Sequence, residues 1–487
     1  ITGEVGECGL YVRISEHRGD GGIRQLCDWT EGSVGAMRFV DWRNRQLQRA
    51  TTGLVVGPAM QEHGDRRSSL AYHALVVFSF LYYTRPQDVI PGLADLPVEK
   101  IVGGIVLVAL IAGLATRRLK ARVPLEIKLL LLLFADLCVT IPFAFWKGGS
   151  FSVVFEQFSK AVLVALLVAM VVQNVGQLRR LLWVQAAAVA TMTCLSIALH
   201  PGGVRLQGVL GGIFENPNDL AVDIAINWPL GVAFLLAARG LVRKTFWVIG
   251  LLGMVYGLIA TFSRSGFIAM SVAMLACFWE YGIRGKRVAL VGLTGILVVG
   301  TVAVAVSTPH YLSRLHSIVQ GGSADAEDEA SWEARRELLV SSVELALRHP
   351  VFGVGPGNFP AVTESWHVTH NTYTEFAAEA GFPALILFVT ILALAFRNLR
   401  RVRKTETYAR NEEVRLFTGA LWASLAAYLV GALFSSTEYN LFPYFMVGYT
   451  SALSALSLPA AEARPEVDSY TLAARFRSSM KLTAPNR

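Results

Sequence analysis

The chain has 487 residues, of which 53% are hydrophobic and only 16% are charged, and its mean hydropathy is +0.47. A soluble domain usually carries about 25% charged residues. The deficit is spread over many apolar runs of roughly twenty residues, which excludes an ordinary soluble enzyme and predicts an all-α polytopic membrane protein. The net charge of +8 requires no nucleic-acid partner, because most of the excess lies in short loops between apolar runs.

The five cysteines show no Cys-x-x-Cys spacing, so neither a metal knuckle nor a disulfide framework is indicated. An acidic cluster at residues 325–329 could bind a divalent ion, but no rigid spacing fixes its ligands. A solvated loop is therefore the favoured interpretation. We expect no metal and no cofactor.

Residues 1–67 contain nine arginines, nine acidic residues and no apolar run, and we expect a poorly ordered cytoplasmic segment there. The apolar runs that follow predict about twelve transmembrane helices, nine in residues 68–306 and three in residues 381–459. A cytoplasmic tail, residues 460–487, is expected after them. The predicted spans are residues 68–84, 98–116, 124–145, 151–172, 181–199, 219–237, 245–262, 266–283, 288–306, 381–396, 416–434 and 441–459.

The distribution of basic residues predicts the orientation of these spans. With the N-terminus inside, the inner loops carry nineteen basic residues and the five short outer loops carry five. The positive-inside rule then places both termini in the cytoplasm. The same rule places the long interval 307–380, between helices 9 and 10, on the outer side of the membrane.

The interval 307–380 has a predicted internal order. Residues 320–330 read as flexible and acidic, and residues 332–348 read as a helix with Trp332, Leu339, Val343 and Leu347 on one face. A proline at position 350 stops this helix. The sequence GVGPGNF, residues 353–359, predicts a turn-rich loop whose backbone can approach a ligand closely; Gly355, Gly357 and Asn358 belong to it.

His370 and Asn371 directly precede a helical run that enters the tenth span. A neutral imidazole, with an ordinary pKa near 6.5, can accept a proton at ambient pH. His370 is therefore the candidate general base, and Asn371 is expected to cap the helix or to orient a ligand. The alternative interpretation of His370 is a capping or surface histidine.

Four arginines on the predicted outer side are candidate phosphate ligands, because a guanidinium binds phosphate in a bidentate manner. Arg264 lies in FSRSG at the outer end of the seventh span, where an unpaired charge is costly. Arg335 and Arg336 lie on the predicted helix, and Arg205 lies in an outer loop. Snorkelling to the interface explains Arg264 equally well, and a plain surface position explains the other three.

The stretch FENPNDLA, residues 214–221, contains Asn216 and Asn218 at the start of the sixth span. Asn218 or Asp219 is expected to be the N-cap of that helix. A polar shell at the outer membrane surface is the functional alternative.

Together these elements resemble the O-antigen ligase and O-antigen polymerase superfamily. The ligase pattern, His-Asn, nine residues and Gly, is matched by His370-Asn371, TYTEFAAEA and Gly381, although Ala384 departs from its last position. A second pattern of the family, an arginine followed by Trp, Pro and GVGPGNF, favours Arg335 by its spacing, but a leucine replaces the Trp. FSRSG and NPND are also familiar from that family. The resemblance covers residues 200–400 by motif and the earlier spans by hydropathy.

The resemblance implies a metal-independent, inverting transfer of a glycan from undecaprenyl diphosphate to an acceptor hydroxyl at the periplasmic membrane face. The partners would be the lipid-linked donor, membrane lipids and a hydroxyl of lipid A core, of a glycan or of a protein. His370 would take the acceptor proton, and Arg264 and Arg335 would neutralise the diphosphate. A polysaccharide polymerase and a protein O-oligosaccharyltransferase remain alternatives. A multi-span transporter is the alternative from another class, although the two halves of the chain show no duplication.

Overall fold

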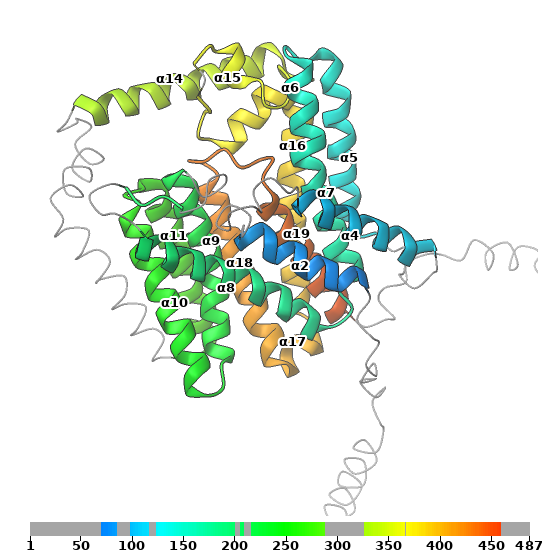
Figure 1. Cartoon of the computed structure of the whole chain (residues 1–487), viewed down its shortest axis with the longest axis vertical. Helices are drawn as coiled ribbons and strands as arrows, with labels where there is room; N and C mark the ends of the chain where they lie inside the picture. Colours follow the sequence, from blue (N-terminus) through cyan, green and yellow to red (C-terminus); the bar gives the residue numbers. More distant parts are fainter. Residues whose placement is uncertain are drawn as a thin grey trace, which may run out of the picture. The chain divides into compact units, whose positions relative to one another are not determined.

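The computed structural model describes residues 70–84, 98–115, 123–199, 205–208, 216–287, 326–365 and 367–458. The predicted terminal segments 1–67 and 460–487 and the predicted ninth span, residues 288–306, lie outside the described residues. Every regular element in the described ranges is helical, which confirms the all-α class (Figure 1).

The described helices follow the predicted spans closely along the chain. Two π-helical stretches, η2 and η4, interrupt or end longer helices. The elements are α2 (Leu70–Thr84), α4 (Val98–Ala115), α5 (Leu125–Thr140), η1 (Ile141–Phe143), α6 (Lys147–Ser152), η2 (Val153–Phe158), α7 (Ser159–Val171), α8 (Val175–Leu199), α9 (Pro217–Ala237), α10 (Leu241–Ala260), α11 (Arg264–Cys277), η4 (Phe278–Ile283), α14 (Ala326–Arg348), α15 (Phe359–Val362), α16 (Thr372–Val402), α17 (Glu406–Arg410), α18 (Glu412–Gly431) and α19 (Leu441–Ser457).

Seven helical segments among the described residues are long and apolar enough to cross a membrane. They comprise α6 to α7 taken together, α8, α9, α10, α11 with η4, α16 and α18. The protein is therefore a multi-pass membrane protein. The total of twelve spans stays a prediction, because the predicted spans at α2, α4, α5 and α19 are not among these seven and the ninth predicted span is not described.

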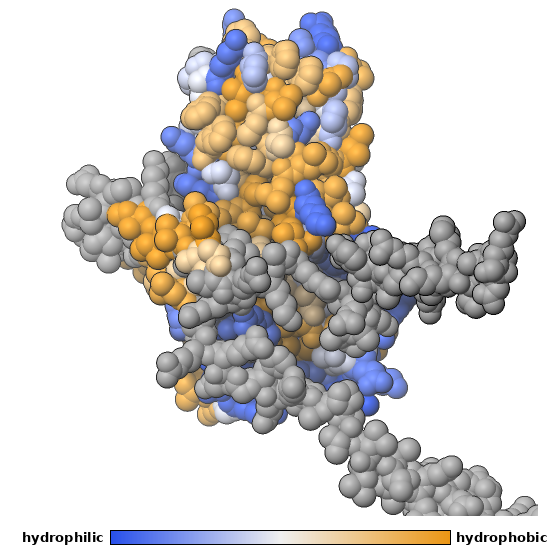
Figure 2. All heavy atoms as spheres, turned by 90° about the vertical axis from the view of Figure 1, so that its right-hand side faces the viewer, coloured by the Kyte–Doolittle hydropathy of each residue, from blue (hydrophilic) through white to orange (hydrophobic). Residues whose placement is uncertain are grey.

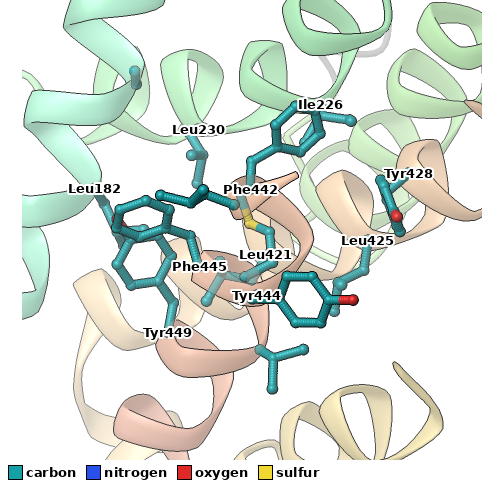
Figure 3. Close-up of a cluster of buried hydrophobic side chains, with 14 of the residues drawn as sticks. Leu182, Ile226, Leu230, Leu421, Leu425, Tyr428, Phe442, Tyr444, Phe445 and Tyr449 are labelled. Atoms are coloured by element: carbon teal, nitrogen blue, oxygen red, sulfur yellow. The ribbon is translucent and has the colours of Figure 1, made fainter. Parts of the chain in front are cut away.

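Aromatic and branched side chains pack where α8, α9, α18 and α19 meet. Leu182, Ile226, Leu421 and Phe445 come from these four helices and point toward one another (Figure 3). All four are fully buried. Between membrane helices such close packing, rather than exclusion from water, supplies much of the association energy.

Apolar side chains also cover much of the outside of the bundle. On the face shown in Figure 2, hydrophobic residues spread over the middle, and hydrophilic residues gather toward the two ends. Leu132, Val139 and Phe155, on α5 and η2, are between 42% and 53% exposed. Exposure of this kind is expected for side chains that face lipid.

Helix α16 bends sharply at Gly381, whose φ is 81° and ψ is 173°. A Cβ atom at this position would lie 2.3 Å from the carbonyl oxygen of Val351, so the bend needs a glycine. Phe382 N then donates to Pro350 O at 2.9 Å. The bend thus joins the predicted tenth span to the short helix that starts after His370, as the sequence indicated.

Three local predictions are wrong. Helix α14 already begins at Ala326, so residues 326–330 are helical rather than part of a flexible stretch. The predicted apolar face is exposed at Leu339, Val343 and Leu347, and α14 instead buries a narrower face at Leu338, next to α16. Helix α14 places small residues beside Leu338 on the buried face, and small side chains permit the closer approach of a neighbouring helix. The third error, the cap of α9, is described with the site.

Candidate functional site

The candidate residues gather at one end of the helical bundle, where α9 and α16 begin and α10 and α18 end. We call this end the site end. Thr372 N donates to Ala432 O at 2.9 Å and to Ser435 O at 3.0 Å, which joins the start of α16 to the residues after α18. Leu206 N donates to Ala260 O at 2.9 Å, which joins the segment of Arg205 to the end of α10. Figure 1 shows α14, α15 and the start of α16 close together.

Arg205 connects two of these helix ends. Its Nε donates to Thr261 O at 2.9 Å, and its Nη2 donates to Asn218 Oδ1 at 3.1 Å. Asn216, not Asn218 or Asp219, is the N-cap of α9, and its side chain accepts from Asn218 N at 2.9 Å. The cap prediction was wrong because Pro217 fits the first helical position, which moves the cap one residue before it. The Asn218 side chain is thereby left to hold Arg205.

Asp219 extends this network toward α16. Ser435 Oγ donates a hydrogen bond to Asp219 Oδ1. The carbonyl oxygen of Ser435 accepts from Thr372 Oγ1 at 2.6 Å. A chain of direct contacts therefore runs from Arg205 through the start of α9 to Thr372, which lies two residues after His370.

His370 occupies a tight turn immediately before α16. Its φ is 56°, in the left-handed region that few non-glycine residues adopt. Asn371 caps α16, because its Oδ1 accepts from Tyr373 N at 3.0 Å and from Thr374 N at 3.2 Å. The capping role is thus taken by Asn371, which leaves the imidazole of His370 available for other chemistry.

The environment of His370 keeps its side chain neutral. Burial lowers its pKa from 6.5 to about 4, and the positive charges of Arg335 and His367 add to this effect. Arg335 and Arg336 are both exposed on α14, and the choice of Arg335 from sequence spacing stays a prediction.

Arg264 is the first residue of α11 and is half-buried. The preceding Ser263 caps the helix, with its Oγ accepting from Gly266 N at 3.2 Å. Ser263 N in turn donates to Thr261 Oγ1 at 3.2 Å. Since Thr261 also binds Arg205, both arginines belong to the same helix corner at the site end.

The GVGPGNF loop is buried between α16 and the segment η1 to η2, so its glycines approach protein atoms rather than open space. A Cβ at Gly355, where φ is 104°, would lie 2.3 Å from Ala144 Cβ, and a Cβ at Gly357 would lie 2.6 Å from Val153 Cγ2. Asn358 Nδ2 donates to Val354 O at 3.0 Å within the loop. These glycines allow the loop to pack tightly against its neighbours, and the approach of a ligand to its backbone stays a prediction.

Three buried glutamates beneath this loop were missed by the sequence reasoning. Carboxylate oxygens of Glu375, Glu379 and Glu438 lie within 4.8 Å of one another, and each residue is at most 3% exposed. The spacing of Glu375 and Glu379, one helical turn apart, was a signal that could have been noticed. Glu438 is remote in sequence. The expectation of no metal was argued from the absence of a rigid carboxylate cluster, and that argument fails here.

Glu379 holds the GVGPGNF loop directly. It accepts from Gly357 N at 2.7 Å, from Phe359 N at 2.9 Å and from Tyr439 OH at 2.9 Å. Glu375 holds the turn before His370, since Thr369 N and Thr369 Oγ1 donate to it at 3.0 and 2.8 Å. The two loops of the site are therefore tied to one face of α16.

The structure thus places Arg205, Asn216, Asn218 and Arg264 around one helix corner, and Asn371 next to His370 at the start of α16. Contacts through Asp219 link the two groups. The positive charge of Arg335 acts on His370.

Comparisons with known proteins agree with the motifs. Residues 249–389 match a family model described as O-antigen ligase. The matched range contains Arg264, Arg335, His370 and Gly381 but not Arg205. No curated protein matches the chain. A chain from a solved structure described as "Structural coordination of polymerization and crosslinking by a peptidoglycan synthase complex" is 17% identical, with 68% of this chain and 94% of that chain covered; its TM-score of 0.38 is too low to support an argument.

The family match covers the helix corner of Arg264, the GVGPGNF loop and the His370 turn, which are the elements that carry the resemblance in sequence. Residues 249–389 are therefore similar to the O-antigen ligase family, and this match supports the resemblance of this multi-pass membrane protein to the O-antigen ligase and O-antigen polymerase superfamily.

Proposed function

We propose that the protein transfers a glycan from undecaprenyl diphosphate to an acceptor hydroxyl at the periplasmic face of the bacterial inner membrane. The observation that carries this proposal is the meeting of a neutral histidine and several arginines at one end of a bundle of membrane helices. His370 and Arg335 interact electrostatically, and Arg205 and Arg264 share one helix corner. Both termini would be cytoplasmic, and residues 307–380 would be periplasmic.

The proposed reaction is a single displacement. His370 removes the proton from the acceptor hydroxyl while the acceptor oxygen attacks the anomeric carbon of the donor sugar. The bond from that carbon to the phosphate oxygen breaks, the diphosphate leaves with the electron pair, and the configuration at carbon is inverted. Arg264 and Arg335 stabilise the leaving diphosphate by charge-assisted hydrogen bonds, so this step needs no metal at the phosphates.

The low pKa of His370 fits this order of events. In the free protein the imidazole is uncharged at neutral pH and ready to accept a proton. When a donor binds, its negative diphosphate offsets the charge of Arg335 and raises the pKa of the imidazole toward its ordinary value. The base therefore becomes stronger when the substrate is in place.

The decisive experiment uses purified protein, a defined polyprenyl-diphosphate glycan and candidate acceptors. Product formed by the wild type and lost in the His370→Ala and Arg264→Ala variants supports the proposal. Donor movement across proteoliposomes without any new glycosidic bond would instead identify a transporter.

The acceptor is assigned by profiling glycans in a strain that lacks the gene. Intact lipid-linked polymer together with unmodified lipid A core identifies a ligase, which is the function we propose. Accumulation of single repeat units identifies a polymerase, and loss of a glycoprotein identifies a protein O-oligosaccharyltransferase.

A further inference from the structure

The three buried glutamates at the site end have an arrangement that hydrogen bonds alone do not explain. Glu375 and Glu379 project from one face of α16, and Glu438 comes from the loop between α18 and α19. Their exposed fractions are 3%, 1% and 3%. Charged carboxylates are almost never buried so completely unless a cation or a set of donors compensates them.

The donors around the cluster leave a coordination position on each carboxylate. All three hydrogen bonds to Glu375, two from Thr369 and one from Ser436, fall on its Oε2, so Oε1 remains for another partner. On Glu379, Oε1 accepts only from Phe359 N, so one of its lone pairs is unused. Oε2 of Glu438 is buried and has no hydrogen-bond partner.

The three glutamates have no cationic partner among the ion pairs of the described residues. Glu375 and Glu379 accept hydrogen bonds from backbone N–H groups, so both carboxyl groups are held in place. Three carboxyl groups therefore share a small buried volume.

The size of the cluster suits one hard cation. The three oxygens lie within 4.8 Å of one another. Calcium binds oxygen ligands at about 2.3–2.6 Å, so oxygens on opposite sides of such an ion lie about 4.6–5.2 Å apart. Magnesium, with about 2.0–2.1 Å, would need a slight contraction.

We infer that Glu375, Glu379 and Glu438 bind a hard divalent cation, Ca²⁺ or Mg²⁺, through one oxygen each. The ion would fix the turn before His370, the GVGPGNF loop and the loop between α18 and α19 against one another, since each loop is held by one of these glutamates. It is a structural ion, separate from the diphosphate, and its presence does not depend on the proposed glycosyl transfer.

The test measures metal directly in full-length protein purified in detergent. After passage through metal-free buffer, the wild type should contain about one equivalent of Ca²⁺ or Mg²⁺ per chain by mass spectrometry of the elements. The Glu438→Gln variant should contain less than a tenth of that amount. Glu344→Gln, which alters an exposed ion pair on α14, is the matched control and should retain the metal.

Thermal unfolding provides the second measurement. Removal of the ion with a chelator should lower the melting temperature of the wild type by several degrees, and added Ca²⁺ or Mg²⁺ should restore it in a concentration-dependent manner. Glu438→Gln should show neither change. If that variant does not fold, Tb³⁺ bound to stripped wild type replaces it as the probe, with emission sensitised by the nearby Tyr439 and lost when Ca²⁺ competes.

Three results would overturn the inference. One is wild-type protein without stoichiometric metal and with a melting temperature indifferent to chelator, Ca²⁺ and Mg²⁺. Another is Glu438→Gln with the metal content of the wild type, which would place the ion elsewhere. The last is an equal melting temperature for untreated wild type, chelator-treated wild type and Glu438→Gln, which would mean that the carboxyl group of Glu438 is protonated and binds no ion. Loss of glycosyl transfer alone decides nothing about the ion.

Discussion

Substitution of His370 tests whether its side chain acts as the general base or only maintains the turn before α16. The left-handed backbone at this residue costs on the order of 1–3 kcal/mol for most side chains, and asparagine tolerates it better than most. His370→Asn therefore preserves the turn, while His370→Ala keeps a comparable backbone strain. The cap of α16 is supplied by Asn371, so neither variant removes it. We expect the melting temperature to change little in His370→Asn.

The expected loss of activity is much larger than any structural effect. General-base catalysis typically contributes about 10²–10⁴-fold, so single-turnover transfer from a pre-bound lipid-linked donor should slow by that factor in both variants. Donor binding, measured separately, should persist. His367→Ala is the control, since His367 is exposed and lies outside the capped turn, and it should retain most of the activity.

The pH profile gives an independent check on the same residue. Because the pKa of His370 is lowered to about 4 in the free protein, kcat/KM should hold between pH 7 and pH 5.5 and fall only toward pH 4. Stability changes with pH in the same direction. Because the pKa of this histidine is higher in the unfolded chain than in the folded protein, its protonation favours unfolding and lowers the free energy of unfolding as the pH falls from about 6.5 to about 4. Wild-type rates in His370→Asn, or an acid limb centred at pH 6.5, would refute the role assigned to His370.

Further predictions concern the arginines, the loop and the topology. Arg335→Ala should weaken donor binding by about 1.5–3 kcal/mol in a lipid-binding assay and Arg336→Ala should not; the reverse result would shift the assignment by one residue. Gly355→Ala should lower the melting temperature more than Gly240→Ala, because both have a positive φ but only Gly355 would also clash with its neighbours; equal effects would contradict the tight packing at Gly355. A cysteine placed at the exposed Glu337 in a cysteine-free background should react with an impermeant maleimide in intact spheroplasts, and labelling only after lysis would contradict a periplasmic α14.

The sequence alone was sufficient for the class of fold and for the family. A run of about twenty apolar residues crosses the membrane as a helix, because every backbone polar group must then be hydrogen-bonded within the segment. The span boundaries follow from where these runs end, and the helix after His370 follows from Asn371, whose side chain can cap locally. The number of residues between His370 and Gly381 can be counted in the sequence, so the motif and the resemblance could be found without a structure.

What only the tertiary structure decided is how distant residues meet. The face of α14 was misjudged because burial depends on the helix that packs against it, not on the apolar pattern of α14 alone. The close packing of Gly355 against Ala144 and of Gly357 against Val153 also depends on residues that are distant in the sequence. Glu438 lies near Glu379 only because the α18–α19 loop folds over the start of α16. A contact between residues so far apart in the sequence cannot be predicted from sequence spacing.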